Sequence, residues 1–174
     1  MKFLVIIVAS VCANLNFYQA VTVSGNHDQN SNKPSAHIEA VSRGELTYQA
    51  NQLIKDWNAN DTNSHLAGGM KYHDGKLTVP TTGRYYIYLQ IYYHSTGRIQ
   101  VRVNGRVRTM IQIPVPDKGV HGTAYAGGIF NLIAGDVITI YSTRNNCKIY
   151  MSTFHTYFGA YLIGEKMTNA PNTS

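Results

Sequence analysis

The sequence predicts an all-β fold, an antiparallel sandwich or barrel. Runs of β-branched and aromatic residues recur at short intervals, and turn residues separate them. No stretch keeps the 3.6-residue apolar period of an amphipathic helix. With 174 residues, of which 44% are hydrophobic and 14% charged, the chain is long enough for one domain with a substantial core and too short for two ordinary domains.

Eight segments have the composition and the alternation of strands. They are residues 36–41, 76–79, 84–93, 99–103, 107–115, 123–132, 137–142 and 157–163. Gly135-Asp136 is a turn signal between two strongly apolar strands. Asn104-Gly105 is a hairpin signal, but a two-residue loop would place Val103 opposite Arg106. We therefore expect a bulged or three-residue turn, which aligns Val103 with Val107.

The two ends of the chain differ in composition from the predicted domain. Lys2 precedes an apolar run at 3–13 that is too short to span a bilayer comfortably, which is typical of a secretory signal. We expect a signal peptide at 1–20, a flexible stalk at 21–34, the folded domain at 35–164 and a loose tail at 165–174, in a secreted, extracellular protein. The alternative is an uncleaved anchor at 3–18, which would make the chain a type II membrane protein.

The segment from Tyr85 to Tyr93 carries the most informative pattern. Its alternation places Ile87, Leu89 and Ile91 on one face and Tyr86, Tyr88, Gln90 and Tyr92 on the other. The aliphatic face belongs to the core. Three tyrosines on the second face offer apolar area whose hydroxyls need partners, which suits a protein interface. The alternative is that they are good strand formers on a partly exposed face.

Two adjacent glycines, Gly127 and Gly128, interrupt an apolar strand. Glycine weakens a strand unless another group approaches its backbone closely. The pair therefore indicates either packing against the tyrosines or a plain bulge.

The chain is basic, with a formal charge of +6, but it has no block of Lys and Arg like a nucleic-acid arm, so nucleic acid is not an expected partner. A basic strip lies around the predicted hairpin and contains Arg98, Arg102, Arg106 and Arg108. It suits either an acidic partner or a solvated strand face that resists aggregation.

No pattern predicts catalysis, a cofactor or a small-molecule substrate, so the chain is not expected to be an enzyme. It has no nucleophile elbow, phosphate loop or histidine pair at metal-ligand spacing, and its seven histidines are dispersed, so no metal site is expected. Cys147 is predicted to be a small buried filler. Asn60-Asp61-Thr62 matches the glycosylation acceptor pattern and makes Asn60 a candidate site.

Five segments together resemble the tumour necrosis factor ligand family, in order and in spacing. They are Lys33-Pro34-Ser35-Ala36-His37-Ile38, Leu53-Ile54-Lys55-Asp56-Trp57, Gly83-Arg84-Tyr85-Tyr86-Ile87-Tyr88-Leu89-Gln90, Gly128-Ile129-Phe130-Asn131-Leu132 with Gly135-Asp136, and Tyr157-Phe158-Gly159-Ala160. The resemblance covers residues 33–164. Residues 151–160 and Asp56-Trp57 look most like ectodysplasin and the invertebrate Eiger-type ligands.

This resemblance implies a ten-stranded antiparallel jelly-roll β-sandwich that assembles as a homotrimer. It further implies a secreted cytokine that binds receptors of the tumour necrosis factor receptor family in the clefts between subunits and clusters their ectodomains. The alternative is a non-signalling trimeric module similar to the complement globular heads. The Tyr-rich strand and the lack of collagen repeats argue against that alternative.

The resemblance also assigns residues to surfaces. Positions that match the family's trimer contacts are His37, Tyr86, Tyr88, Gln90, Tyr125 and Tyr157. Candidates for receptor contacts, in loops that vary within the family, are Arg43, Glu45, Arg98, Asn104, Arg106 and Arg144. Trp57, Ile87, Leu89, Phe130 and Ile140 match core positions. The chain departs from the family in lacking paired cysteines and in its short Asn104-Gly105 hairpin, so the resemblance does not identify the receptor.

Overall fold

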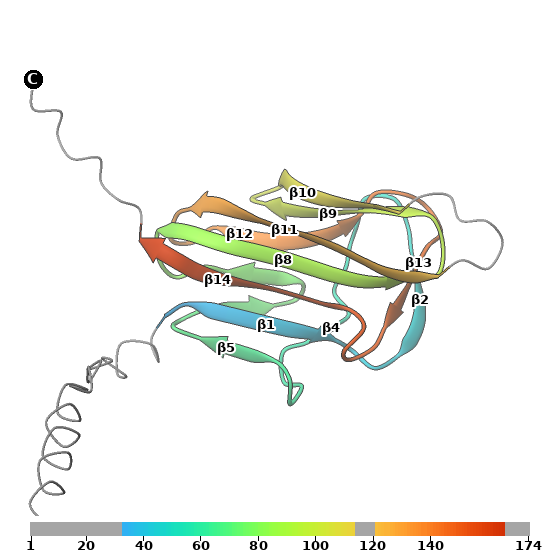
Figure 1. The fold of residues 1–174 in the computed structure, drawn as a ribbon, viewed down its shortest axis with the longest axis horizontal. Coiled ribbons are helices and arrows are strands. Elements are labelled where there is room, and N and C mark those ends of the chain that lie inside the picture. The colour runs from blue at the N-terminus through green and yellow to red at the C-terminus, as the bar shows by residue number, and fades with distance from the viewer. Residues whose placement is uncertain (1–32, 114–120, 166–174) are drawn as a thin grey trace, which may run out of the picture.

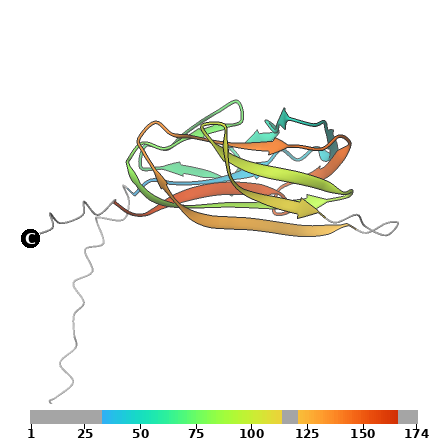
Figure 2. The same ribbon diagram turned by 90° about the horizontal axis from the view of Figure 1, so that it is seen from above.

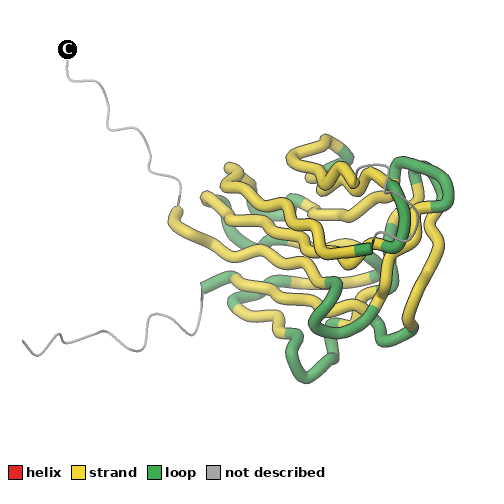
Figure 3. Tube along the Cα trace, turned by 45° about the vertical axis from the view of Figure 1, so that its right-hand side comes forward, coloured by secondary structure: helices red, strands yellow, loops and turns green. Residues whose placement is uncertain are grey.

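Two antiparallel sheets form the fold of this chain. The computed structural model describes residues 33–113 and 121–165, and the fourteen strands of these ranges are shown in Figures 1 and 3. The predicted signal peptide, the predicted stalk up to residue 32 and the predicted tail from residue 166 lie outside the described residues. Within the described ranges, no helix has the length and apolar character needed to cross a membrane.

The first sheet contains eight strands in the order β2-β13-β8-β14-β1-β4, with β11 also paired to β8 and β5 to β1. Their bounds are Ser35–Ala40 for β1, Gly44–Tyr48 for β2, Trp57–Asn58 for β4, His65–Ala67 for β5, Gly83–Tyr93 for β8, Gly122–Leu132 for β11, Cys147–Met151 for β13 and Tyr157–Glu165 for β14. Figure 1 shows β5, β1, β14 and β8 side by side in this sheet.

The second sheet contains six strands in the order β10-β9-β12-β7-β6, with β3 paired to β12. Their bounds are Gln52–Leu53 for β3, Lys71–His73 for β6, Lys76–Thr78 for β7, Gly97–Val103 for β9, Arg106–Ile113 for β10 and Val137–Ser142 for β12. The two sheets stack as layers of a sandwich, which is visible from above in Figure 2. The predicted all-β antiparallel sandwich is therefore confirmed. Each of the eight predicted strands is present within three residues, although residues 114 and 115 lie outside the described ranges.

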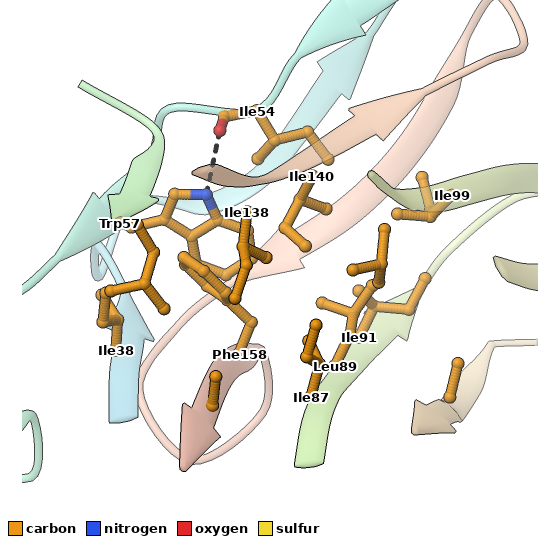
Figure 4. Close-up of a cluster of buried hydrophobic side chains, with 14 of the residues drawn as sticks. Ile38, Ile54, Trp57, Ile87, Leu89, Ile91, Ile99, Ile138, Ile140 and Phe158 are labelled. Atoms are coloured by element: carbon orange, nitrogen blue, oxygen red, sulfur yellow. Dashed lines mark hydrogen bonds between the residues drawn. The ribbon is translucent and has the colours of Figure 1, made fainter. Parts of the chain in front are cut away.

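The core fills the space between the sheets (Figure 4). Strand alternation turns Ile87, Leu89 and Ile91 of β8 inward, where all three are fully buried. The Trp57 ring packs against Phe158 with their centroids 4.7 Å apart, and its indole N–H donates to the carbonyl of Ile54. The indole therefore adds a large apolar surface to the core without leaving its polar group unpaired.

The predicted core residues are mostly where the sequence places them. Trp57 and Ile140 are buried, whereas Phe130 is only half-buried and packs against the edge of the core. Cys147 is fully buried, as expected of a filler, and this burial raises the pKa of its thiol.

The hairpin between β9 and β10 corrects one prediction. Its loop has two residues, Asn104 and Gly105, both with positive φ, and Arg106 does pair with Val103. The expected three-residue turn and the alignment of Val103 with Val107 are wrong, because the tight turn with two left-handed residues fits the twist of the strands. A bulge between Val107 and Thr109 shifts the register, so that Ile111 and Ile113 farther along β10 face the core.

Candidate interaction surface

The outward face of the first sheet carries aromatic side chains from four neighbouring strands, β1, β14, β8 and β11. The register sets them in rows across the sheet. One row runs His37, Gly159, Tyr88, Gly127; the rows beside it run Tyr161, Tyr86, Ile129 and Tyr157, Gln90, Tyr125. We call the side chains of His37, Tyr86, Tyr88, Gln90, Tyr125, Ile129, Tyr157 and Tyr161 the tyrosine face.

Hydrogen bonds within the chain satisfy most polar groups of the tyrosine face. The hydroxyl of Tyr88 lies 2.8 Å from Nδ1 of His37. The hydroxyls of Tyr86 and Tyr125 lie 2.9 Å apart. Tyr157 donates to Oε1 of Gln90 at 2.9 Å. Because these groups already have partners, a protein that covers the face need not supply one for each of them.

Two glycines make room for the rings of this face. A Cβ on Gly159 would stand 2.4 Å from the Tyr88 hydroxyl and 2.3 Å from the carbonyl oxygen of Ala36. A Cβ on Gly127 would stand 2.5 Å from the Tyr86 hydroxyl. The register between β11 and β8 is continuous across Gly127, so the glycines serve ring packing and not a bulge.

The tyrosine face leaves much apolar area open to solvent in the single chain. The exposed fractions are 52% for Tyr125, 60% for Ile129 and 45% for Tyr161. By contrast, Tyr88 is half-buried in the centre, and burial raises its pKa to about 12. Rigid aromatic side chains with an exposed apolar surface are typical of a site that contacts another protein.

The chain is similar to known proteins in sequence and in fold. Residues 55–115 match the model of the TNF (Tumour Necrosis Factor) family. Tumor necrosis factor of Rattus norvegicus is 27% identical over 166 residues, covering 81% of this chain and 66% of that protein, and the one from Peromyscus leucopus is 24% identical over 163 residues with the same shares. The structure of Eiger TNF from S. frugiperda matches with a TM-score of 0.65 at 17% identity, over 82% of this chain and 98% of the other. In sequence and in fold, the chain thus resembles the tumour necrosis factor ligand family.

These similarities confirm the resemblance to this family and the predicted fold class. Tumour necrosis factor family proteins are non-enzymatic ligands, which agrees with the expectation that this chain is not an enzyme. The chain spans about two thirds, 66%, of the length of the two rodent tumour necrosis factors. The likeness to Eiger TNF concerns the fold, and the finer placement beside Eiger-type ligands stays a prediction.

The structure brings all six predicted trimer-contact residues together on the tyrosine face. Ile129 and Tyr161 were not among the predicted contact residues, although they are among the most exposed apolar residues of this face. Strand parity could have found both, because Ile129 lies four residues after Tyr125 and Tyr161 four residues after Tyr157. The role of Gly159 as space for Tyr88 has no such signal, because it depends on the register between β14 and β8.

The six receptor-contact candidates do not form one cluster. Arg98 lies near the start of β9 and Asn104 just beyond its end, which separates them by about 20 Å of extended strand. Glu45 accepts hydrogen bonds from Lys148 at 2.9 Å and from His94 at 2.7 Å, and these contacts hold the pKa of its carboxyl below the usual range. Arg43 lies 3.5 Å from Asp56 and is exposed, as are Arg106 and Arg144.

The Asn104 side chain is occupied within the domain. Its amide donates to Oδ1 of the buried Asp136 at 2.7 Å, and its carbonyl oxygen accepts from the N–H of Val137 at 2.9 Å. Its side chain thus ties two turns together. Asn60 is exposed between β4 and β5, and its glycosylation stays a prediction.

Three of the dispersed histidines meet at one end of β8. His94, His121 and His155 line a shallow pocket of about 350 Å³ with Tyr92 and Tyr150. The rings of His94 and Tyr150 stack with centroids 5.7 Å apart. In the ranges 33–113 and 121–165, no group of three or more His, Cys, Asp or Glu side chains is arranged to hold a metal ion.

Proposed function

We propose that this chain is a cytokine that assembles as a homotrimer through the tyrosine face and binds a receptor ectodomain of the tumour necrosis factor receptor family. The observation that carries the proposal is the open aromatic face of β1, β14, β8 and β11. Gly127 and Gly159 leave room for its rings, and Ile129 and Tyr125 expose more than half of their surface. The similarity to tumour necrosis factors supports the same function.

A cyclic trimer needs two different surfaces on each subunit, because its contacts join one patch to another and close after three steps. The tyrosine face offers such a pair. Tyr125 and Ile129 lie on β11, and His37 lies on β1, at the other side of β8 and β14. In the proposed trimer, the β11 side of one copy packs toward the β1 side of the next.

Receptor binding is proposed for the cleft that such packing creates between subunits. Arg43 and Glu45 supply charged side chains at the β2 edge, and Arg98 and Arg144 lie near each other, because Thr143 donates to the carbonyl of Arg98. Charged residues at the rim of an interface chiefly set the association rate and the choice of partner.

An isoleucine pair tests the proposed trimer. Ile129→Asp places a charge on the tyrosine face, whereas Ile133→Asp places the same charge in the turn after β11. Both residues are highly exposed, at 60% and 63%, so neither change should unfold a single chain. Light scattering after size exclusion should give a monomer for Ile129→Asp and a trimer for Ile133→Asp. A trimeric Ile129→Asp protein contradicts the proposed interface.

Receptor binding is tested separately from trimer assembly. A panel of tumour necrosis factor receptor-family ectodomains from the same organism should contain a member that binds the wild-type trimer. Arg43→Ala with Glu45→Ala should weaken that binding, and Lys55→Ala is the control, because Lys55 pairs with Asp74 and with neither of these residues. A panel without any binder would contradict receptor binding and leave the trimer intact. Sequencing the amino terminus of protein from the medium tests secretion and leader removal.

A further inference from the structure

The second sheet has an unusual charge composition. Its six described strands contain six lysines and arginines and no aspartate or glutamate. The cations are Lys71, Lys76, Arg98, Arg102, Arg106 and Arg108. Since the whole chain has 15 Lys and Arg against 9 Asp and Glu, much of its net charge of +6 belongs to this one sheet.

The strand register gathers four of these cations on the outward face of the sheet. Arg102 lies opposite Thr139 of β12, and Thr139 lies opposite Lys76 of β7. Arg102 and Lys76 are thus two strands apart, or about 10 Å. Lys71 pairs with Thr78, the next outward position of β7, and Arg98 is the outward residue four positions before Arg102 on β9. We call Arg98, Arg102, Lys71 and Lys76 the basic face.

Neutral groups, and not carboxylates, hold the two arginines of the basic face in place. Nε and one terminal nitrogen of Arg102 donate to Oε1 of Gln100, and its guanidinium carbon lies 4.2 Å from the centre of the Tyr141 ring. Nε of Arg98 donates to Oε1 of Gln112 at 2.6 Å. The guanidinium groups are thereby positioned at the surface with their full charge.

The carboxylates near this sheet have other partners. Asp74 pairs with Lys55 at 2.7 Å, and although the charge of Lys76 also helps to lower the pKa of Asp74, these two residues form no ion pair. Asp136 is buried and accepts from Asn104 and from the N–H of Ile133. Among the described residues, no ion pair involves any of the six cations of the second sheet. The basic face is therefore electrostatically open to an anion.

We propose that the basic face binds a linear sulfated polysaccharide. Such a chain carries anionic groups at regular intervals, and it can cross β9, β12 and β7 to meet Arg102 and Lys76 in turn. Guanidinium groups match the geometry of oxyanions. An acidic protein partner fits less well, because protein interfaces have an apolar centre depleted of charge, whereas charged and hydroxyl side chains occupy the centre here. The proposal goes beyond receptor binding and requires no trimer.

Immobilised heparin is the probe for this proposal. The full chain is passed over heparin at several NaCl concentrations, and its affinity is compared between two double variants. Lys76→Gln with Arg102→Gln alters the basic face, whereas Arg43→Gln with Lys148→Gln removes the same two charges from the β2 and β13 edge of the other sheet. A second face variant, Lys71→Gln with Lys76→Gln, changes only exposed lysines and leaves the Tyr141 contact intact.

The wild-type chain should bind heparin at about 0.15 M NaCl, and affinity should fall steeply with salt. Each face variant should bind about tenfold more weakly and with a shallower salt dependence. The edge variant should stay close to wild type. Equal losses in face and edge variants would overturn the proposal, because they would reflect net charge alone. Absence of wild-type binding, or equally effective competition by polyglutamate, would also overturn it.

Discussion

Nδ1 of His37 lies 2.8 Å from the hydroxyl of Tyr88, although the two residues are 51 positions apart in the chain. The contact joins β1 to β8 across β14, the strand that separates them in the sheet. Gly159 is the residue of β14 that both of them face in the register. The centre of the tyrosine face therefore depends on a position without a side chain.

Gly159→Ala should destabilise the fold. The added methyl group would meet the carbonyl oxygen of Ala36 at 2.3 Å, and backbone there cannot move without disturbing the β1–β14 pairing. Overpacking of this kind costs about 1–3 kcal/mol in the free energy of unfolding. Gly164→Ala is the matched control, because its new Cβ would have only an ordinary contact with Arg84 at 3.7 Å. Urea unfolding of both variants makes the comparison, and equal stability of the two would count against the packing argument.

The buried phenol of Tyr88 predicts a loss of stability at alkaline pH. Its pKa is raised to about 12 by burial, above the ordinary value of about 10 for an unfolded chain. The folded state therefore favours the protonated phenol. The stabilisation that the protonated phenol gives to the folded state is fully present below about pH 10 and is lost as the pH rises through about 12. Urea unfolding across that window should show a smaller loss for Tyr88→Phe than for wild type, whereas parallel curves would show that Tyr88 does not contribute.

A leucine pair tests the inward assignment of β8. Leu89 is fully buried, whereas Leu66 on β5 is 38% exposed. Leu89→Ala should lower the free energy of unfolding by about 2–5 kcal/mol, because it removes buried apolar surface and leaves a cavity. Leu66→Ala should cost clearly less. Calorimetry of the two proteins under one condition checks the order, and a reversed order would contradict the core described above.

We expect Asn104 to contribute to the stability of the fold, independently of any receptor contact. Asn104→Ala removes two hydrogen bonds, deprives the buried Asp136 of one of its partners and places alanine at a φ of 49°. Leaving a buried acceptor short of a partner costs about 1–3 kcal/mol. Arg106→Ala in the same hairpin should change stability by less than about 0.5 kcal/mol. Thermal unfolding separates the two, and an unchanged melting temperature for Asn104→Ala would exclude this structural role.

Strand alternation was enough to predict the main elements of the fold. The β-branched and aromatic runs located every long strand, and period-two parity in β8 separated Ile87, Leu89 and Ile91 from the tyrosines on the opposite face. Most short strands were missed, although β13 does alternate, with Cys147, Ile149 and Met151 inward. Two-residue strands such as β3 and β4 have no sequence period, because they exist only through pairing with distant strands.

The sequence predicted part of the candidate site, and the rest depends on the tertiary structure. Tyr86, Tyr88 and Gln90 follow from parity within one strand. Their arrangement with His37 and Tyr157 depends on which strands are neighbours, a choice that local sequence does not encode. The resemblance to the family supplied that information. The hairpin at Asn104-Gly105 shows the limit of parity, since a bulge after the turn restored the alternation that we expected of the turn itself.

The native mass of the wild-type chain is the most direct test of the proposed assembly. Sedimentation equilibrium over a range of protein concentrations gives this mass without assumptions about shape. The tyrosine face predicts a trimer, with three times the mass of one chain, that persists on dilution. A stable monomer would contradict the account, because the exposed apolar side chains of Tyr125, Ile129 and Tyr161 would then have no subunit to cover them.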